Sequence, residues 1–356
     1  MIMIESRLER IKAIRPPQHL KFACGVVLVL LLPTATAAQN HELFGPQGLA
    51  PARNFQPIQG LSLQMPGESA IPLKKGELTL RAHVAETSTV LNDVQPGIAA
   101  SLKLNQLHSN LEIRYGLSQA TEFSVELTSV YNHSGALDGA IEAIELMGAG
   151  RLANARQQLK NSGFVFVVDR NGRPVLEGKN GDAGLSDLIL RSKILLVAER
   201  KWLPAIALRP ALKIPLGESS QAFSTGQVDF GIGVAAQKTF ADRLILYVNV
   251  NEVFPTGHHL GYALKPYFIS VGGAEIRFTP RFSVMSHIYH SQSPYDGTGT
   301  KILDQGTADI AVAFGYRFTP NLLGQIYGVE NLMSGSAADF TLGMAVTYRL
   351  TLRQDS

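Results

Sequence analysis

The sequence predicts an all-β protein: a transmembrane, antiparallel, up-and-down β-barrel of about 12 strands, with a helical insertion in one extracellular loop. Three observations support this fold class. Apolar and polar residues alternate in repeated stretches of about ten residues, and the connections between these stretches are alternately short and long. Many charged residues also fall on the face opposite the apolar stripe. Together these features are typical of a barrel with lipid outside and water inside.

Residues 1–38 have the order of a secretory signal peptide. A basic stretch ends at Lys21, the apolar run 22–32 follows, and small residues occupy 34–38. We expect cleavage after Ala37 or Ala38 and export to the outer membrane. A membrane-spanning helix is the alternative, but the apolar run falls well short of the ~20 residues that such a helix needs.

The charge and cysteine content limit the possible functions. The net charge of +3 comes entirely from residues 1–38, so the rest of the chain is formally neutral and we expect no nucleic-acid partner. The only cysteine, Cys24, lies in the same segment. The mature chain is therefore expected to have no disulfide, no thiolate metal site and no cofactor.

Residues 39–75, called the leader below, are rich in proline and glycine and do not alternate cleanly. One interpretation is a flexible periplasmic segment. The other is a plug that enters the barrel lumen, because the apolar residues of this segment would otherwise be exposed to water. The sequence leaves both interpretations open.

The barrel itself is expected at 76–352, followed by a tail at 353–356. The alternation is clearest at the end, where Phe340, Leu342, Met344 and Val346 are separated by polar or small residues, a pattern that helical spacing cannot produce. Short turns are expected at the periplasmic end and long loops outside the cell. The expected strands are about 76–87, 108–117, 121–131, 184–198, 204–214, 226–240, 243–254, 267–278, 280–290, 306–318, 321–331 and 338–352.

A soluble β-sandwich or barrel also alternates, so it is the rival interpretation. The expected strands are longer than the ~5–6 residues usual in soluble sheets, and aromatic residues gather near the short turns. A dry core would also not accept the many charges opposite the apolar stripe, whereas a wet lumen would. The candidate lumen-lining charges are Arg81, Glu112, Arg114, Glu126, Asp187, Arg191, Arg209, Lys213, Asp229, Asp309 and Arg349.

The loop 132–183 is the largest departure from a minimal barrel. We expect a helix over 136–161 and then a hairpin over 164–176 with an Asn171-Gly172 turn. Such a loop is usually functional, as a lid, a binding surface or a constriction of the lumen. The candidate constriction residues are Leu137, Asp138, Ile141, Glu142 and Glu145.

Several motifs resemble those of one known family. They are Arg53–Ile58, Pro66–Ala70, Leu137–Glu142 and Arg170–Arg173, together with the signal sequence. They resemble an uncharacterised proteobacterial family of outer-membrane barrels, domain of unknown function 3187, over the mature chain from about residue 44. The resemblance implies an outer-membrane barrel of unknown activity and assigns no functional residues.

The sequence offers no convincing catalytic or metal site. The adjacent pairs His108-Ser109, His133-Ser134 and His290-Ser291 point to opposite faces of their strands, so none can act as a nucleophile and base. His287 and Ser291 share a face but lie two pleats apart. His258-His259 lacks the third ligand that a metal site needs.

Three functions remain after this search. The first is a narrow or partly occluded pore for small solutes, because a barrel of about twelve strands lies between filled ~8-stranded and open ~16-stranded barrels. The second is a structural or surface-interaction barrel acting through 132–183, and the third is a lipid-modifying outer-membrane enzyme. The lumen charges nearly balance, so they either pair and fill the interior or leave a wet passage. Expected partners are the lipid bilayer with lipopolysaccharide and the barrel-assembly machinery.

Overall fold

The computed structural model describes residues 45–135, 139, 141, 142, 154–333 and 335–351. The expected signal peptide at 1–38 and the tail at 353–356 lie outside the described residues. The same is true of three candidate constriction residues, Leu137, Asp138 and Glu145.

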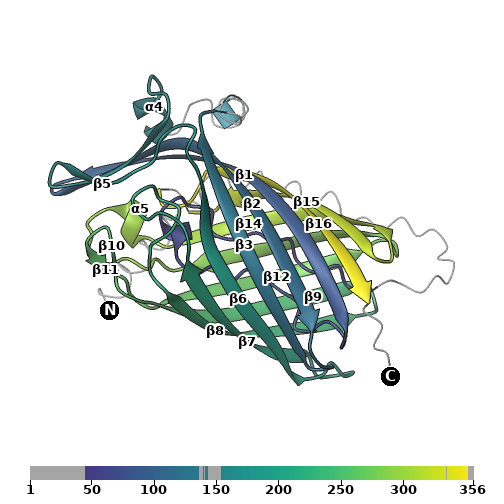
Figure 1. The fold of residues 1–356 in the computed structure, drawn as a ribbon. Coiled ribbons are helices and arrows are strands. Elements are labelled where there is room, and N and C mark those ends of the chain that lie inside the picture. Colours follow the sequence, from purple (N-terminus) through teal and green to yellow (C-terminus); the bar gives the residue numbers. More distant parts are fainter. Residues whose placement is uncertain (1–44, 136–138, 140, 143–153, 334, 352–356) are drawn as a thin grey trace, which may run out of the picture.

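Twelve antiparallel strands form a closed barrel (Figure 1). β1 pairs with both β2 and β16, which closes the ring. The sheet has 14 strands in all, because β4 pairs with the start of β2 outside the ring and β5 pairs with β4. The prediction of an antiparallel barrel of about twelve strands is therefore confirmed. The barrel strands are β1 (Glu77–Gln95), β2 (Ile98–Gly116), β3 (Thr121–His133), β6 (Ala183–Val197), β7 (Ala205–Pro215), β8 (Asp229–Phe240), β9 (Leu244–Pro255), β12 (Tyr267–Arg277), β13 (Phe282–Ser291), β14 (Thr307–Thr319), β15 (Leu322–Asn331) and β16 (Phe340–Thr351).

The barrel exposes its apolar face and buries its polar one. On β16, Leu342, Met344 and Val346 are 51%, 55% and 48% exposed, whereas Thr341 and Ala345 are each 2% exposed. Strands β8 and β9 repeat this pattern. A surface of this kind is unfavourable in water and favourable in hydrocarbon, so the barrel has the outward face of a membrane protein.

The aromatic residues expected near the short turns do lie at that end of the barrel. Five of them are more than two-fifths exposed: Phe240, Phe278, Tyr316, Phe318 and Tyr348. They lie at strand ends beside the connections β8–β9, β12–β13 and β14–β15 and beside the start of β1. Aromatic rings favour the boundary between hydrocarbon and water. This end of the barrel, called the short-turn end below, therefore has the character of one membrane interface.

The predicted loop at 88–107 is wrong. Strands β1 and β2 continue through it as a hairpin that extends beyond the barrel, with Gln95 paired to Ile98. On β1 the alternation stops at the base of the extension, where Thr87 to Leu91 are consecutive and all buried, whereas Ile98–Leu104 of β2 still alternates between buried and half-buried residues. A strand that is buried on both sides loses its period of two, so the sequence pattern did not reveal it.

The extension carries the hairpin expected at 164–176. β4 (Val165–Arg170) pairs with residues 98–103 of β2, and β5 (Arg173–Glu177) pairs with β4. Asn171 and Gly172 have φ values of 51° and 75°, the left-handed backbone that a tight hairpin turn requires. We call residues 88–107 and 165–177 the canopy (Figure 1).

The remaining elements are short. They are the 3₁₀ helix η1 (Gln59–Leu61), α4 (Asn154–Gln158), α5 (Lys301–Asp304) and the hairpin of β10 (His258–His259) with β11 (Tyr262–Ala263). The five residues of α4 belong to the helix expected at 136–161, most of which lies outside the described residues. Within the described ranges, no helix has both the length and the apolar character needed to cross a membrane.

Candidate functional site

The first half of the leader runs through the barrel from the short-turn end to the canopy. At the start, the backbone N–H groups of Gln47 and Gly48 donate to the Glu275 carboxylate at 3.0 Å. Phe55 then meets the His108 ring edge-on, with centroids 5.3 Å apart. At the far end, the Gln59 side-chain amide donates to the backbone oxygen of Ile302 at 2.8 Å. Because Ile302 belongs to α5, in the long connection between β13 and β14, η1 lies at the canopy end.

The second half of the leader returns to the short-turn end. The Leu63 N–H donates to Asp229 at 2.8 Å, Arg209 donates to the Pro66 oxygen at 2.9 Å, and the Leu73 N–H donates to Glu122 at 2.8 Å. β1 begins directly afterwards at Glu77. The described part of the leader, 45–75, therefore forms a U inside the lumen with its bend under the canopy.

Side chains of the barrel wall provide hydrogen-bond partners for the irregular backbone of the leader. A segment rich in proline and glycine, without helix or strand pairing over most of its length, leaves N–H and C=O groups that must be satisfied when buried. Carboxylates accept the N–H groups, and cations and hydroxyls donate to the C=O groups; Tyr267, for example, donates to the Leu63 oxygen at 2.7 Å. The polar inward face of the barrel is thus matched to the leader.

Apolar contacts hold the U at its bend and along its return. Ile58 and Leu61 are buried with Leu91 and Leu102 of the canopy. Leu63, Met65 and Leu49 pack against inward-facing residues of β9 and β12. A Cβ atom on Gly67 would lie 2.8 Å from side-chain atoms of both Leu49 and Val271, so the two arms and the wall are in close contact there.

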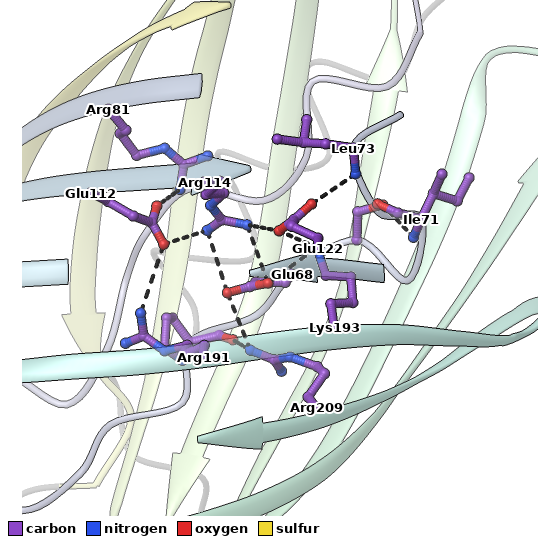
Figure 2. Close-up of polar contacts among 12 residues, drawn as sticks. Glu68, Ile71, Leu73, Arg81, Glu112, Arg114, Glu122, Arg191, Lys193 and Arg209 are labelled. Atoms are coloured by element: carbon purple, nitrogen blue, oxygen red, sulfur yellow. Dashed lines mark hydrogen bonds and ion pairs between the residues drawn. The ribbon is translucent and has the colours of Figure 1, made fainter. Parts of the chain in front are cut away.

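Charged side chains line one half of the lumen, on β1, β2, β3, β6 and β7 (Figure 2). Glu112 contacts Arg114 at 2.9 Å, Arg81 at 3.4 Å and Arg191 at 3.7 Å. Glu126 contacts Arg191 at 2.7 Å. These charges form one network across neighbouring strands instead of lying on opposite walls.

The leader joins this network through two side chains. Arg53 of the outgoing arm contacts Glu126 at 2.8 Å. Glu68 of the returning arm contacts Arg114 at 3.2 Å, Lys193 at 3.3 Å and Arg209 at 3.4 Å. All of these side chains are buried or nearly so, hence the interactions are weakly screened by salt.

A second, smaller ion-pair group lies nearer the canopy. Lys213 contacts Asp229 at 3.0 Å and Asp187 at 3.7 Å, and it donates to the Leu61 oxygen at 2.7 Å. This lysine therefore links wall carboxylates to the bend of the leader.

The candidate lumen charges occupy inward-facing positions of their strands. Nine of the eleven take part in the ion pairs just described. Asp309 is buried on β14, and Arg349 is half-buried on β16 at the short-turn end. Of the candidate constriction residues, Ile141 is buried and Glu142 is half-buried.

The contacts of α4 lie away from the lumen wall. Gln158 accepts from Asn92 at 2.8 Å, and Arg156 pairs with Asp339 at 2.7 Å. These partners belong to the extension of β1 and to the segment before β16. In the described part of the chain, the lumen is filled by the leader.

The opposite half of the lumen carries tyrosines that the sequence reasoning missed. Tyr247, Tyr267, Tyr289 and Tyr327 are all almost fully buried on β9, β12, β13 and β15. The Tyr289 hydroxyl donates to the side-chain oxygen of Gln64 at 2.7 Å. Their inward position was the available signal, since each follows the parity of the polar face of its strand.

Two small cavities lie beside the U. One cavity of about 20 Å³ lies between its two arms and the charged wall, beside Arg53, Glu68, Arg81 and Glu112. A second, of about 50 Å³, lies toward the canopy. Such volumes hold one to a few water molecules each.

The candidate catalytic and metal residues are dispersed. His287 and Ser291 both face the lumen and not the lipid, and Ser291 donates to the Gln292 backbone oxygen. His259 contacts the Tyr295 hydroxyl at 2.5 Å. No group of three or more metal-binding side chains occurs among the described residues.

The strand ring, its lipid-type outer face and its polar interior define a β-barrel of the outer-membrane type. Over residues 26–350 the sequence matches the family described as "Protein of unknown function (DUF3187)", and the chain belongs to that family. The resemblance found in the sequence motifs is thereby confirmed. No curated protein matches the chain.

Solved structures support the same fold. The COG4313 outer membrane channel from Pseudomonas putida F1 is similar with a TM-score of 0.53 at 12% identity, covering 79% of this chain and 98% of that one. The NanC porin (TM-score 0.44, 9% identity, 77% and 100% covered) and the KdgM porin (0.41, 9%, 76% and 98%) are more distant. At these identities the likeness concerns the fold.

Proposed function

We propose that this protein is an outer-membrane channel for small solutes that its own leader closes. In this proposal the mature chain begins after Ala37 or Ala38, the barrel-assembly machinery inserts it, and lipid and lipopolysaccharide surround it. Solutes pass when the leader leaves part of the lumen. The observation that carries the proposal is the U formed by residues 45–75, which fills a barrel whose twelve strands pair with one another.

The way the leader is held supports a removable closure. Side-chain contacts, not a β-ladder, join it to the wall, so it can leave without breaking any strand pairing. Both ends of the U also lie at the short-turn end, which leaves a withdrawal path in one direction. The similarity to a solved outer membrane channel agrees with a transport role.

A disulfide between the leader and the wall tests the proposal. A Cβ atom at position 67 would lie 3.5 Å from the Val271 Cβ, within the range of natural disulfides. We expect the oxidised Gly67→Cys/Val271→Cys protein to stay closed in planar bilayers and a reducing agent to restore channel openings. The only natural cysteine, Cys24, lies in the expected signal peptide, so the pair should form cleanly.

The variant Gly67→Cys/Val271→Ser, treated with the same oxidant and reductant, is the matched control. It carries the same steric change on the leader but cannot form the bond, so its openings should not depend on oxidation. Equal conductance of the oxidised and reduced double variant would overturn the proposal that leader movement opens the lumen. If neither the reduced double variant nor the wild type conducts in planar bilayers, the proposal that the protein is a channel is wrong.

A further inference from the structure

We infer that Arg114, Lys193 and Arg209 form a binding site for a small carboxylate, and that Glu68 of the leader occupies this site while the channel is closed. The inference rests on the proposed function and names its substrate class: small solutes that carry a carboxylate group. Such a solute competes with the leader for the same three cations.

The geometry around Glu68 is that of a bound anion. The two terminal nitrogens of Arg114 donate to the two carboxylate oxygens at 3.2 and 3.4 Å, a two-pronged contact. Lys193 and Arg209 approach the same carboxylate at 3.3 and 3.4 Å from two further strands (Figure 2). Three cations from β2, β6 and β7 thus converge on one acidic side chain.

Glu68 is the only acidic residue in 45–75. Its backbone is fixed by Asn249, whose side-chain oxygen accepts from the Glu68 N–H at 2.9 Å and whose amide donates to the Glu68 oxygen at 3.1 Å. The leader therefore presents a single carboxylate, on a short side chain, at a defined place on the wall. A free carboxylate has the same charge and the same two acceptor oxygens.

The three cations respond differently when Glu68 leaves. Arg114 keeps Glu112 and Glu122, and Lys193 keeps Glu122. Arg209, which is 2% exposed, keeps only neutral acceptors on Asn249 and Asn251 among its described contacts. A buried guanidinium without a carboxylate is unfavourable, so a solute anion at this site would stabilise the open state.

The wall around these three cations also has a net positive charge. In the ion-pair network around Glu68, five wall cations face three wall carboxylates, which leaves two positive charges in excess without the leader. An excess of positive charge on a lumen wall favours anions over cations, as rings of cationic side chains do in known pores. The cations in this count are Arg81, Arg114, Arg191, Lys193 and Arg209, and the carboxylates are Glu112, Glu122 and Glu126.

The test measures how fast the Gly67→Cys/Val271→Cys pair crosslinks under a mild oxidant in full-length folded protein. Sodium acetate is the probe, sodium chloride at equal ionic strength is the reference, and acetamide is the uncharged analogue. If acetate displaces Glu68, crosslinking slows about tenfold, in the range usual for coupled binding sites. Acetamide should leave the rate unchanged.

Three substitutions in the cysteine-pair background locate the effect. Arg209→Gln should abolish the response to acetate, and Lys193→Gln should weaken it. Glu218→Gln, which removes one negative charge from an exposed loop, should leave the response intact. Heat-modifiable mobility on gels checks that each variant forms the barrel. If Arg209→Gln does not form the barrel, Lys193→Gln is the test: a full acetate response in that variant would overturn the inference.

Equal effects of acetate and acetamide would overturn the inference, as would a full acetate response in folded Arg209→Gln. The result separates this inference from the proposed function. If acetate slows crosslinking but the reduced protein never conducts, the site stands and the channel fails. If the reduced protein conducts and acetate has no effect, the channel stands and the carboxylate site is wrong.

Discussion

The two halves of the lumen hold the same leader by different physical means. The half formed by β1, β2, β3, β6 and β7 uses buried ion pairs, such as Glu126 with Arg53 and Arg191. The half formed by β9, β12, β13 and β15 uses mainly tyrosine hydroxyls and apolar packing, as Tyr267 does with the Leu63 oxygen, and one carboxylate, Glu275, at the start of the leader. Both halves follow the same inward parity, so strand position alone does not determine how a lumen wall binds its contents.

The difference lies in what happens when one partner is lost. Removing one member of a buried ion pair leaves a charge in a site of low dielectric constant, which costs about 3–5 kcal/mol. Removing a neutral hydrogen bond costs about 1 kcal/mol. We therefore expect the charged half to control whether the leader stays, and the tyrosine half to position it.

The largest effect is expected from Glu126→Gln. This carboxylate lies within 2.8 Å of both Arg53 and Arg191, and the neutral amide would leave two buried guanidinium groups poorly compensated. We expect a loss of about 3–5 kcal/mol in the free energy of unfolding, measured by denaturant titration in lipid vesicles. A loss of unfolding free energy smaller than that of Tyr267→Phe would contradict the contrast between the two halves.

A smaller effect is expected on the outer face, which serves as a reference for both halves. Val346→Arg places a charge on the lipid side of β16 and should cost roughly 2–4 kcal/mol near the membrane midplane. Thr347→Gln, on the neighbouring inward position, should be tolerated well. Equal damage from both, measured by heat-modifiable gel mobility, would mean that the assignment of inside and outside is wrong.

The smallest effect is expected from Tyr267→Phe. The ring and its packing remain, and only the hydroxyl that donates to the Leu63 oxygen is lost. We expect a loss of about 1 kcal/mol, by the same denaturant titration, and a modest increase in channel openings. Tyr316→Phe, which changes an exposed tyrosine of the short-turn end, is the matched control and should have no effect on openings. A loss as large as that of Glu126→Gln would show that the tyrosine half also controls leader retention.

The barrel could be predicted from the amino-acid pattern, because hydrocarbon imposes a strict rule on every spanning strand. Each outward residue must be apolar, so β16 alternates cleanly from Phe340 to Leu350 and its partners follow the same period. The same rule predicts which charges point inward, since a charge that faces lipid is unfavourable. The Asn171-Gly172 turn was also readable, because its backbone needs residues that tolerate a positive φ.

The path of the leader and the pairing of the charges depend on contacts between distant parts of the folded chain. Residues 45–75 have no periodicity, so their path depends on wall groups more than a hundred residues away, such as Asp229 for Leu63. The continuation of β1 into the hairpin at 88–107 escaped detection for a related reason, because burial of Thr87 to Leu91 on both faces interrupts the alternation there. Pairing between Glu68 and Arg114, Lys193 and Arg209 likewise requires three strands to be brought together around one leader residue. A local sequence pattern indicates which face of the strand a side chain lies on, but not which distant residue becomes its hydrogen-bond or ion-pair partner.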